Sequence, residues 1–379
     1  MKIVFVSKLM PKQMKASSTD ITTDNLIKGL YQNNLEIVLV LFTDCKSDEY
    51  IEYINSNYSS IAKKIIILET KYQKKSKTKY ATLISNFENY FFNKHTYKKE
   101  IDDLSTFVDD NSILLSHTPN LCSIFFCREF KKKFINIKYI QYWSDPITLT
   151  GINPEKYSFK RFPYKWLEGK CLSLADEIVY GPKTLYFFQK KFFPKLQIKM
   201  RGVDLFYTIK ETDNKIDISN DNSFLYAGNY YKYTRNIEPL FQAFQEIDND
   251  YNLIVYGSGD VQLPEGNNIK IMDRISPKQL EIIENTYLNI ICLMNSSGIQ
   301  IPGKIFYNME QPHNILVIAD GKYRGEIIEY LQSYNRFIIV DNNVNSIIEG
   351  LNTINSLQFD IEKIKEDYSP KKIANDIIK

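Results

Sequence analysis

The stretch SSGIQIPGKIFYNMEQPHNILVIAD, Ser296–Asp320, decides the fold of this chain. A polar loop leads into Pro302, which suits the first turn of a helix because no N–H is needed there. Lys304 follows in the same turn, and the apolar run Ile315–Ala319 then predicts a strand. Backbone N–H groups and the helix dipole favour anions at a helix start, so Gly303 and Lys304 predict a phosphate site.

Two segments upstream predict the same ligand. Phe224–Ala227 has the pattern of a short strand that turns at Gly228, and the helix after it begins beside Arg235. Leu253–Asp260, LIVYGSGD, is a second strand pattern, and it ends in a Gly-Ser-Gly sequence from Gly257. Three strand ends, each followed by a glycine-bearing or polar loop, predict ligand loops at the carboxyl edge of a parallel sheet.

The order of these pieces resembles the C-terminal nucleotide-binding domain of GT-B glycosyltransferases of the family-4 type (glycosyl transferases group 1). In that family a strand, a glycine and a basic helix start precede a Gly-x-Gly strand end and then a Pro-x-Lys helix before another strand. The matching positions are Gly228, Arg235, Gly257, Gly259, Pro302, Lys304 and Tyr307. The resemblance extends over most of the chain, including ADEIVYGP at Ala175–Pro182 and RGVDL at Arg201–Leu205.

The resemblance implies an α/β GT-B fold, with two Rossmann-like domains facing each other across a ligand cleft. Residues 1–205 would form the acceptor-binding domain, and residues 206–365 would bind the nucleotide-sugar donor. A final helix, about 366–379, would cross back onto the first domain. The polar segment Thr208–Asn222 has no periodicity and is the expected linker, and a length of 379 residues also favours two domains.

Strand and helix patterns alternate in both halves, which predicts parallel sheets with helices on both faces. The expected strands are Lys2–Ser7, Leu35–Phe42, Lys64–Leu68, Ser112–Ser116, Lys138–Tyr142, Glu177–Tyr180, Gln197–Met200, Phe224–Ala227, Leu253–Tyr256, Ile269–Ile271, Leu288–Leu293, Ile315–Ile318 and Phe337–Val340. We expect a helical tail over Ile361–Lys379, interrupted at Ser369-Pro370.

The composition predicts a folded cytoplasmic protein. Hydrophobic residues make up 44% and charged residues 25% of the chain, as in ordinary globular domains. The apolar run Ile3–Val6 is too short for a signal peptide and predicts a first strand, and no run approaches the length of a membrane span. The five cysteines have no paired spacing, so we expect reduced, structural thiols and no metal site.

The charge is distributed unevenly. Residues 1–205 carry a net charge of +11 and residues 206–379 a net charge of −8. The densest basic stretch, Lys71–Glu100, interleaves lysines with aromatic residues, and RFPYKW at Arg161–Trp166 and QKKFFPK at Gln189–Lys195 repeat this mixture. Such a stretch suits an anionic membrane surface, a single-stranded nucleic acid, or a solvated loop with inward-packed aromatics. We expect no nucleic-acid partner and a peripheral location at the inner face of the membrane.

Lys304 and Arg235 are the residues expected to hold the donor diphosphate. The leaving group of the implied reaction is a nucleoside diphosphate, and fixed cations stabilise its developing charge without a metal. The alternatives are a surface lysine at position 304 and a helix-surface pair between Arg235 and Glu238, with Lys232 as a substitute cation. Ser18, in the first strand-to-helix loop, could donate to phosphate or belong to a helix cap.

Three residues of the N-terminal half are candidates for the reaction and the acceptor. His117 follows the strand pattern Ile113–Ser116, and the resemblance implies a histidine there close to the donor sugar; the alternative is a loop histidine that caps the next helix. Trp143 and Asp145 follow another strand, where a ring and a carboxylate would suit a sugar acceptor. A buried Trp beside an Asp-Pro turn explains them equally well.

The nucleotide contacts implied by the resemblance are at Gly228, Gly257, Arg274 and Tyr307. The family carries a pair of glutamates eight residues apart, which would fall at positions 299 and 307, where this chain has Ile299 and Tyr307. The second glutamate of the pair usually binds the ribose hydroxyls. Glu310, one turn beyond Tyr307, is the expected replacement because it would share a helix face with it.

The leading hypothesis is a hexosyltransferase that moves a sugar from a nucleotide-diphosphate donor, preferably a UDP-sugar, to a glycan or lipid-linked glycan. The family implies retention at the anomeric carbon, no metal, and a role in cell-surface polysaccharide synthesis. The second hypothesis is a catalytically degenerate GT-B subunit that binds glycan or supports a partner transferase. A sugar-nucleotide epimerase of the same shape is the third, although it requires carboxylates and a histidine around the donor.

Overall fold

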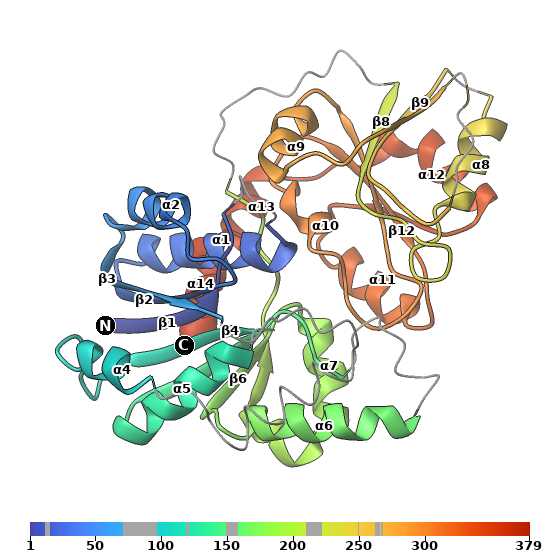
Figure 1. Cartoon of the computed structure of the whole chain (residues 1–379). Coiled ribbons are helices and arrows are strands. Elements are labelled where there is room, and N and C mark those ends of the chain that lie inside the picture. Colours follow the sequence, from blue (N-terminus) through green and yellow to red (C-terminus); the bar gives the residue numbers. More distant parts are fainter. Residues whose placement is uncertain are drawn as a thin grey trace. The chain divides into compact units, whose positions relative to one another are not determined.

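The computed structural model describes residues 1–11, 16–70, 97–118, 121–148, 158–209, 222–248, 250–261, 266 and 268–379. They form two compact units. Unit 1 comprises Met1–Thr148, Tyr157–Asp204 and Pro370–Lys379, and the main part of unit 2 is Leu205–Ser369. Each unit is a parallel sheet covered by helices (Figure 1). Most of the expected linker, 210–221, lies outside the described residues.

Unit 1 contains a seven-stranded sheet with the order β3-β2-β1-β4-β5-β6-β7. Its strands are β1 (Lys2–Lys8), β2 (Glu36–Thr43), β3 (Ala62–Glu69), β4 (Ile113–Thr118), β5 (Lys138–Trp143), β6 (Glu177–Tyr180) and β7 (Met200–Gly202). All pairs are parallel, and Val4 of β1 lies between Val38 of β2 and Leu114 of β4. The run Ile3–Ser7 is wholly buried, as expected for a strand covered on both faces.

The helices of unit 1 are α1 (Ser18–Gln32), α2 (Asp48–Tyr58), α4 (Lys98–Leu104), α5 (Leu121–Lys133), α6 (Ser158–Leu172), α7 (Lys183–Phe192), the 3-10 helix η1 (Pro194–Lys199) and α14 (Pro370–Ile378). Figure 1 shows α1 and α5 on opposite faces of the sheet.

The C-terminal helix α14 packs against α1. A Cβ on Gly29 would lie 2.3 Å from the carbonyl oxygen of Pro370, so this glycine permits the close approach. The Asn33 side chain donates to the carbonyl of Lys371 at 2.7 Å, and the Arg201 guanidinium donates to the carbonyls of Asp376 and Ile377 at the end of α14.

Unit 2 contains a six-stranded parallel sheet with the order β10-β9-β8-β11-β12-β13. Its strands are β8 (Ser223–Ala227), β9 (Asn252–Tyr256), β10 (Ile269–Met272), β11 (Asn289–Leu293), β12 (Asn314–Ala319) and β13 (Ile338–Asp341). Its helices are α8 (Glu238–Glu246), α9 (Pro277–Glu284), α10 (Lys304–Tyr307), α11 (Arg324–Gln332), α12 (Val344–Asn352), the 3-10 helix η2 (Ile354–Ser356) and α13 (Ile361–Asp367).

The core of unit 2 has two layers, one on each face of the sheet. Phe241 and Phe244 of α8 pack with Ile347 and Leu351 of α12 on one face. Residues of α10 and α11 pack on the other, including Phe306 and Leu331. The two-sided burial explains why β8, β11 and β12 are apolar runs, whereas β10 alternates buried Ile269 with exposed Lys270.

Both sheets have the doubly wound order that the alternating pattern predicted, and the expected α/β class is confirmed. The prediction of a strand over Gln197–Met200 is wrong, because Pro194–Lys199 forms η1 and the strand begins only at Met200. The expected break in the tail is confirmed, since α13 ends at Asp367 and α14 begins at Pro370. Among the described residues, no helix is long and apolar enough to cross a membrane.

Candidate functional site

The candidate site lies in unit 2, at the carboxyl edge of its sheet. β8 and β11 are neighbours at the centre, with Tyr226 paired to Ile291, and the strand order reverses between them. Loops at such a switch point diverge and leave room for a ligand. Gly228 follows β8 and Asn295 lies just beyond β11, so both belong to this edge.

Lys304 extends from the first position of α10 to the end of β8. Its ammonium Nζ donates to the carbonyl oxygen of Ala227 and lies 4.6 Å from the ring centroid of Tyr226. A Cβ on Gly228 would lie 2.1 Å from this Nζ, so glycine at this position leaves space for the ammonium. α10 has only four residues, and the lysine side chain, rather than the helix dipole, therefore provides most of the positive charge.

Arg235 supplies a second cation in the same place. Its Nε and one terminal nitrogen both donate to the Asn295 side-chain oxygen, at 3.0 and 2.6 Å. The other terminal nitrogen is 3.4 Å from the carbonyl oxygen of Asn229, which also accepts from the Tyr226 hydroxyl at 3.1 Å. The guanidinium is thus held by neutral oxygens.

The two cations repel each other, and no described carboxylate forms an ion pair with either. Burial, and after it the charge of Arg235, lowers the pKa of Lys304 to about 8, whereas the charge of Glu284 acts in the opposite direction and more weakly. Two uncompensated cations in a chain segment of net charge −8 cost electrostatic energy. An anionic ligand at this edge would remove that cost.

The loops that carry these cations are fastened to one another. The Ser296 N–H donates to the carbonyl of Thr234 at 2.9 Å, and its hydroxyl donates to the carbonyl of Tyr233 at 2.9 Å. A Cβ on Gly257 would lie 2.1 Å from the Gly228 carbonyl oxygen. The glycine at the end of β9 therefore allows its loop to pack directly on the β8 loop, which carries Arg235.

The structure brings Gly228, Arg235, Gly257 and Lys304 together, as the sequence predicted. It also shows Asn295 as a residue that sequence reasoning missed, although its place directly after the apolar run of β11 was a signal for an edge residue. Gly303 precedes α10, and a Cβ there would lie 2.8 Å from the Tyr307 hydroxyl.

The other nucleotide-site candidates of unit 2 lie in different surroundings. Arg274 is exposed in the loop between β10 and α9. Glu310 is only 6% exposed, and its charge acts on Arg336, whose pKa burial lowers to about 10. Tyr307 is partly buried, and Ile299 is 1% exposed. Contacts of Arg274, Tyr307 and Glu310 with a nucleotide stay predictions.

His117 in unit 1 is buried at the end of β4 and hydrogen-bonded on both ring nitrogens. Nδ1 lies 2.9 Å from the Thr23 hydroxyl and Nε2 lies 3.0 Å from the Ser144 hydroxyl. Burial lowers the pKa of His117 to about 3, so the imidazole is neutral at physiological pH. It links α1 to the loop after β5, and its role in the reaction stays a prediction.

Trp143 cannot contact an acceptor as predicted. Its side chain is 0% exposed, and its indole N–H donates to the side-chain oxygen of Gln141 at 3.0 Å. The alternative of a buried Trp is therefore the correct one, because the ring completes the core at the end of β5. Asp145, two residues further, is partly buried, and its charge adds to the effect of burial in raising the pKa of Tyr142.

The first strand-to-helix loop of unit 1 is organised by a helix cap. Ser17 is the N-cap of α1 and forms a capping box with Asp20. The cap accounts for a serine at this position without a ligand. Ser18 is exposed in the first turn, and its contact with phosphate stays a prediction. Within the described ranges, no cluster of His, Cys, Asp and Glu has the arrangement of a metal site.

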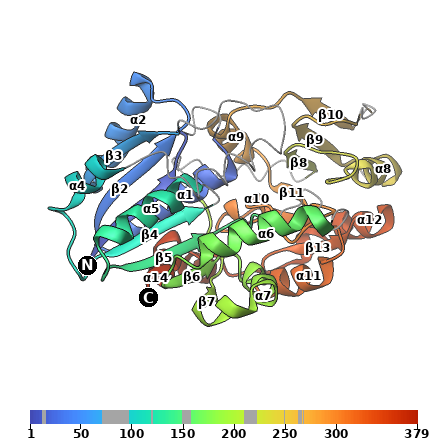
Figure 2. The ribbon, with the colours of Figure 1, turned by 60° about the horizontal axis from the view of Figure 1, so that its bottom comes forward.

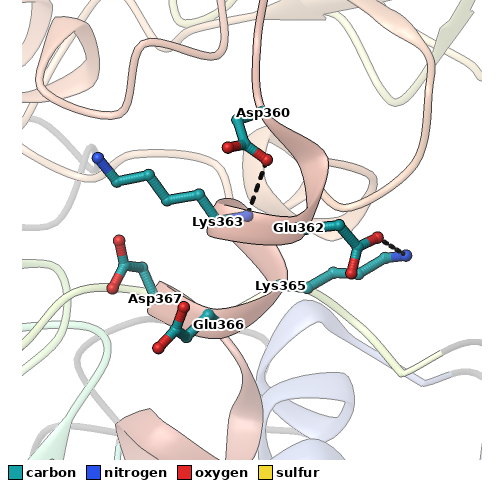
Figure 3. Close-up of a pocket in the computed structure, with 6 residues that line it drawn as sticks. All are labelled: Asp360, Glu362, Lys363, Lys365, Glu366 and Asp367. Atoms are coloured by element: carbon teal, nitrogen blue, oxygen red, sulfur yellow. Dashed lines mark hydrogen bonds and ion pairs between the residues drawn. The ribbon is translucent and has the colours of Figure 1, made fainter.

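A surface hollow beside α13 is a weaker candidate for the phosphate site (Figure 3). Its lining residues are Asp360, Glu362, Lys363, Lys365, Glu366 and Asp367. Asp360 caps the helix by accepting from the Lys363 N–H at 3.1 Å, and Lys365 pairs with Glu362 at 3.0 Å. The four carboxylates outnumber the two lysines, which disfavours a phosphate there.

Comparisons with known proteins identify the fold. No family model matches the chain, and no curated protein matches it. Several solved structures, however, are similar to the chain. The apo lipopolysaccharide outer core galactosyltransferase WaaB is 12% identical, with a TM-score of 0.59 over 100% of this chain and 99% of that one. S. aureus TarM, in complex with Fondaparinux, alpha-GlcNAc-glycerol and UDP, is 11% identical, with a TM-score of 0.59 over 100% and 99%.

A third similar structure is a putative UDP-N-acetylglucosamine 2-epimerase from Listeria monocytogenes. It is 12% identical, with a TM-score of 0.53 over 100% of this chain and 94% of that one. Together with the two doubly wound sheets, these similarities show that the chain has the GT-B fold. Because transferases and an epimerase share it, the reaction has to be argued from the site.

Proposed function

We propose that the protein is a glycosyltransferase that binds the diphosphate of a nucleotide sugar at the carboxyl edge of the unit 2 sheet. The observation that carries this proposal is the pair Lys304 and Arg235, held by neutral oxygens with no ion-pairing carboxylate among the described residues. A diphosphate supplies the missing negative charge. Lys304 binds it as a point charge, and Arg235 binds two of its oxygens at once.

In the proposed reaction, the bond between the anomeric carbon and the diphosphate oxygen breaks, and an acceptor hydroxyl forms the new bond. Negative charge grows on the departing diphosphate, and Lys304 and Arg235 stabilise it without reorganisation because their loops are already fixed. The acceptor proton passes to the departing phosphate or to a base such as Asp145. We propose retention at the anomeric carbon and no requirement for a metal.

The donor is proposed to be a UDP-sugar, which the presence of UDP in the TarM complex supports. The proposed acceptor is a glycan or lipid-linked glycan of cell-surface polysaccharide synthesis, as the similarity to WaaB suggests. Membrane attachment through Lys71–Glu100 stays a prediction, because residues 71–96 lie outside the described ranges.

The second candidate is a degenerate GT-B subunit that binds glycan or supports a partner transferase. Ile299 and Tyr307 favour it, because they replace the carboxylates expected for a nucleotide sugar and Ile299 is buried. The epimerase hypothesis lacks such support, since the hydrogen bonds of Lys304 and Arg235 go to backbone and amide oxygens rather than to a described histidine or carboxylate.

Calorimetric titration with UDP, GDP, CDP and ADP tests the proposal. We expect micromolar binding of one of them, and a loss of about 1.5–3 kcal/mol in Lys304→Ala, as for a hydrogen bond to a charged group. Lys278→Ala, which removes an exposed lysine of α9, is the matched control and should bind normally. Binding of none of the four by the wild type would favour the degenerate subunit.

A turnover assay then separates the two candidates. The wild-type protein is incubated with the sugar conjugate of the nucleotide that binds, and release of the nucleoside diphosphate is followed with and without glycan acceptors. Acceptor-dependent release supports a transferase. Tight nucleotide binding with no release under any acceptor supports the degenerate subunit.

A further inference from the structure

Two basic and aromatic segments of unit 1, separate in the sequence, meet on its surface. Lys165 of α6 places its Nζ 4.2 Å from the ring centroid of Phe192 at the end of α7. A Cβ on Gly169 would lie 3.2 Å from the ring of Phe193, so this glycine lets the helices approach. Figures 1 and 2 both show α6 beside α7. We define the α6–α7 surface as Phe162, Lys165, Lys170, Phe187, Lys190 and Lys191.

The lysines of this surface are not neutralised by carboxylates. On α5, by contrast, Lys131 pairs with Asp176 at 2.7 Å, and Lys132 pairs with Glu129 at 2.8 Å. Within the described part of the chain, none of the four lysines of the α6–α7 surface forms an ion pair.

Aromatic rings take the place of the missing carboxylates. The Nζ of Lys170 lies 5.6 Å from the Trp166 ring, and the Nζ of Lys190 lies 4.9 Å from the Phe187 ring. These contacts hold the ammonium groups over apolar faces and leave their charge available for an external anion.

The surface also exposes large apolar side chains. Phe162 is 71% exposed and Phe187 is 49% exposed. Phe162 and Lys165 are three residues apart on α6, and Phe187 precedes Lys190 and Lys191 by three and four residues on α7, so each phenylalanine shares a helix face with lysines. Exposed rings beside uncompensated ammonium groups are the chemistry of an interfacial helix.

We propose that the α6–α7 surface binds the headgroup region of an anionic lipid bilayer. The phenylalanine rings enter the boundary between headgroups and acyl chains, and the lysines pair with lipid phosphates. Exposed phenylalanine rings among lysines suit a bilayer, whereas a single-stranded nucleic acid binds along a basic groove on which its bases stack. The proposal concerns described residues outside Lys71–Glu100, and it does not depend on the nucleotide site.

Tryptophan fluorescence provides a built-in reporter. The chain has two tryptophans, of which Trp143 is fully buried and Trp166 lies beside Lys170 on α6. We expect vesicles containing phosphatidylglycerol to shift the emission to shorter wavelength, and vesicles of phosphatidylcholine alone to leave it unchanged. Trp166→Phe should abolish the shift while co-sedimentation with the anionic vesicles persists.

The decisive variant is the triple Lys165→Gln/Lys190→Gln/Lys191→Gln, compared by co-sedimentation with Lys2→Gln/Lys63→Gln/Lys132→Gln. Both lower the net charge by three, and only the first changes the α6–α7 surface. At about 1 kcal/mol for each lysine near an anionic membrane, we expect the first triple to lose on the order of 100-fold in partitioning. The second should remain close to wild type.

The apolar contribution is tested with Phe162→Ser/Phe187→Ser, which should weaken binding about tenfold or more. Circular dichroism of every variant confirms folding. Equal losses in the two lysine triples, or no binding of the wild type to anionic vesicles at low salt, would overturn the proposal. So would binding of single-stranded RNA in preference to vesicles, since the surface would then serve a different partner.

Discussion

The carboxyl edges of the two sheets share a topology but differ in how their charges are paired. In unit 1, the Lys8 ammonium at the end of β1 pairs with Asp44 just beyond β2, and His117 is hydrogen-bonded to the hydroxyls of Thr23 and Ser144. In unit 2, the equivalent edge carries Lys304 and Arg235, whose partners are neutral carbonyl and amide oxygens.

The difference indicates which edge is prepared for an anion. Polar groups that satisfy one another inside a protein stabilise the fold and are indifferent to a ligand. Two adjacent cations without a carboxylate destabilise it until an anion arrives, and proteins accept such a cost at functional sites. Lys8 and His117 at the unit 1 edge are therefore satisfied by protein partners, whereas Lys304 and Arg235 at the unit 2 edge lack a carboxylate partner among the described residues, as the proposed diphosphate site requires.

The strongest test gives Arg235 of unit 2 a carboxylate partner, as Lys8 has in unit 1. In Asn295→Asp, the new carboxylate lies against the Arg235 guanidinium and neutralises it. We expect the affinity for the nucleoside diphosphate to fall by about 2 kcal/mol, roughly 30-fold, with unchanged or slightly higher stability to urea. Titration calorimetry and urea unfolding measure the two effects.

The matched control for this variant is Gln332→Glu, which makes the same change in charge at an exposed position of α11. Its affinity should equal that of the wild type. If Asn295→Asp binds as tightly as the control, the phosphate does not contact Arg235, and the comparison between the two edges fails.

The structural character of the unit 1 edge predicts an acid-sensitive fold. Burial lowers the pKa of His117 to about 3, whereas histidine in an unfolded chain titrates near about 6.5. Between these two pKa values the unfolded state binds a proton that the folded state does not. The free energy of unfolding is therefore highest above about pH 6.5 and decreases as the pH falls below it. His117 contributes at most about 1.4 kcal/mol per pH unit to the change of the unfolding free energy with pH.

Urea unfolding of the wild type and His117→Asn at pH 7, 6 and 5 measures this contribution. We expect the wild type to be more stable at pH 7, because the ring is bonded on both nitrogens, and the advantage to shrink as the pH falls. Parallel pH dependence in the two proteins would mean that His117 has the same pKa in the folded and unfolded states, and the imidazole would again be a candidate proton carrier.

The sequence predicted the strands of both units well, because two-sided burial leaves short apolar runs that are easy to recognise. β6 has the expected bounds, Glu177–Tyr180. The failure at Gln197–Lys199 arose where apolar and basic residues follow Pro194, a pattern that also suits a turn of 3-10 helix. Local patterns of this length do not distinguish the two, because tertiary packing decides between them.

The site was only partly predictable for a similar reason. Lys304 and Arg235 carry charge, and their types indicated anion binding wherever the fold placed them. Trp143 and His117 stand at strand ends in the same way, but the sequence does not show whether the side chain of a residue at a strand end turns outward or inward. Burial by neighbours distant in the chain, such as Gln141 and Thr23, settled those orientations.

The smallest expected effect concerns the proton of Lys304. Because burial and Arg235 lower the pKa of Lys304 to about 8, part of the charge that attracts the diphosphate is lost as the pH rises through this value. We expect the affinity to be constant below pH 7 and about fourfold weaker at pH 8.5, as half a pH unit above the pKa implies.

The control for this pH dependence is Lys304→Arg, whose guanidinium stays charged throughout the range. It should bind with an affinity that is lower but independent of pH. A wild-type affinity that does not change between pH 7 and 8.5, measured by titration in buffers of equal ionic strength, would show that Lys304 keeps its proton. The pKa of Lys304 would then lie above this range, and both Lys304 and Arg235 would stay fully charged at the edge of unit 2.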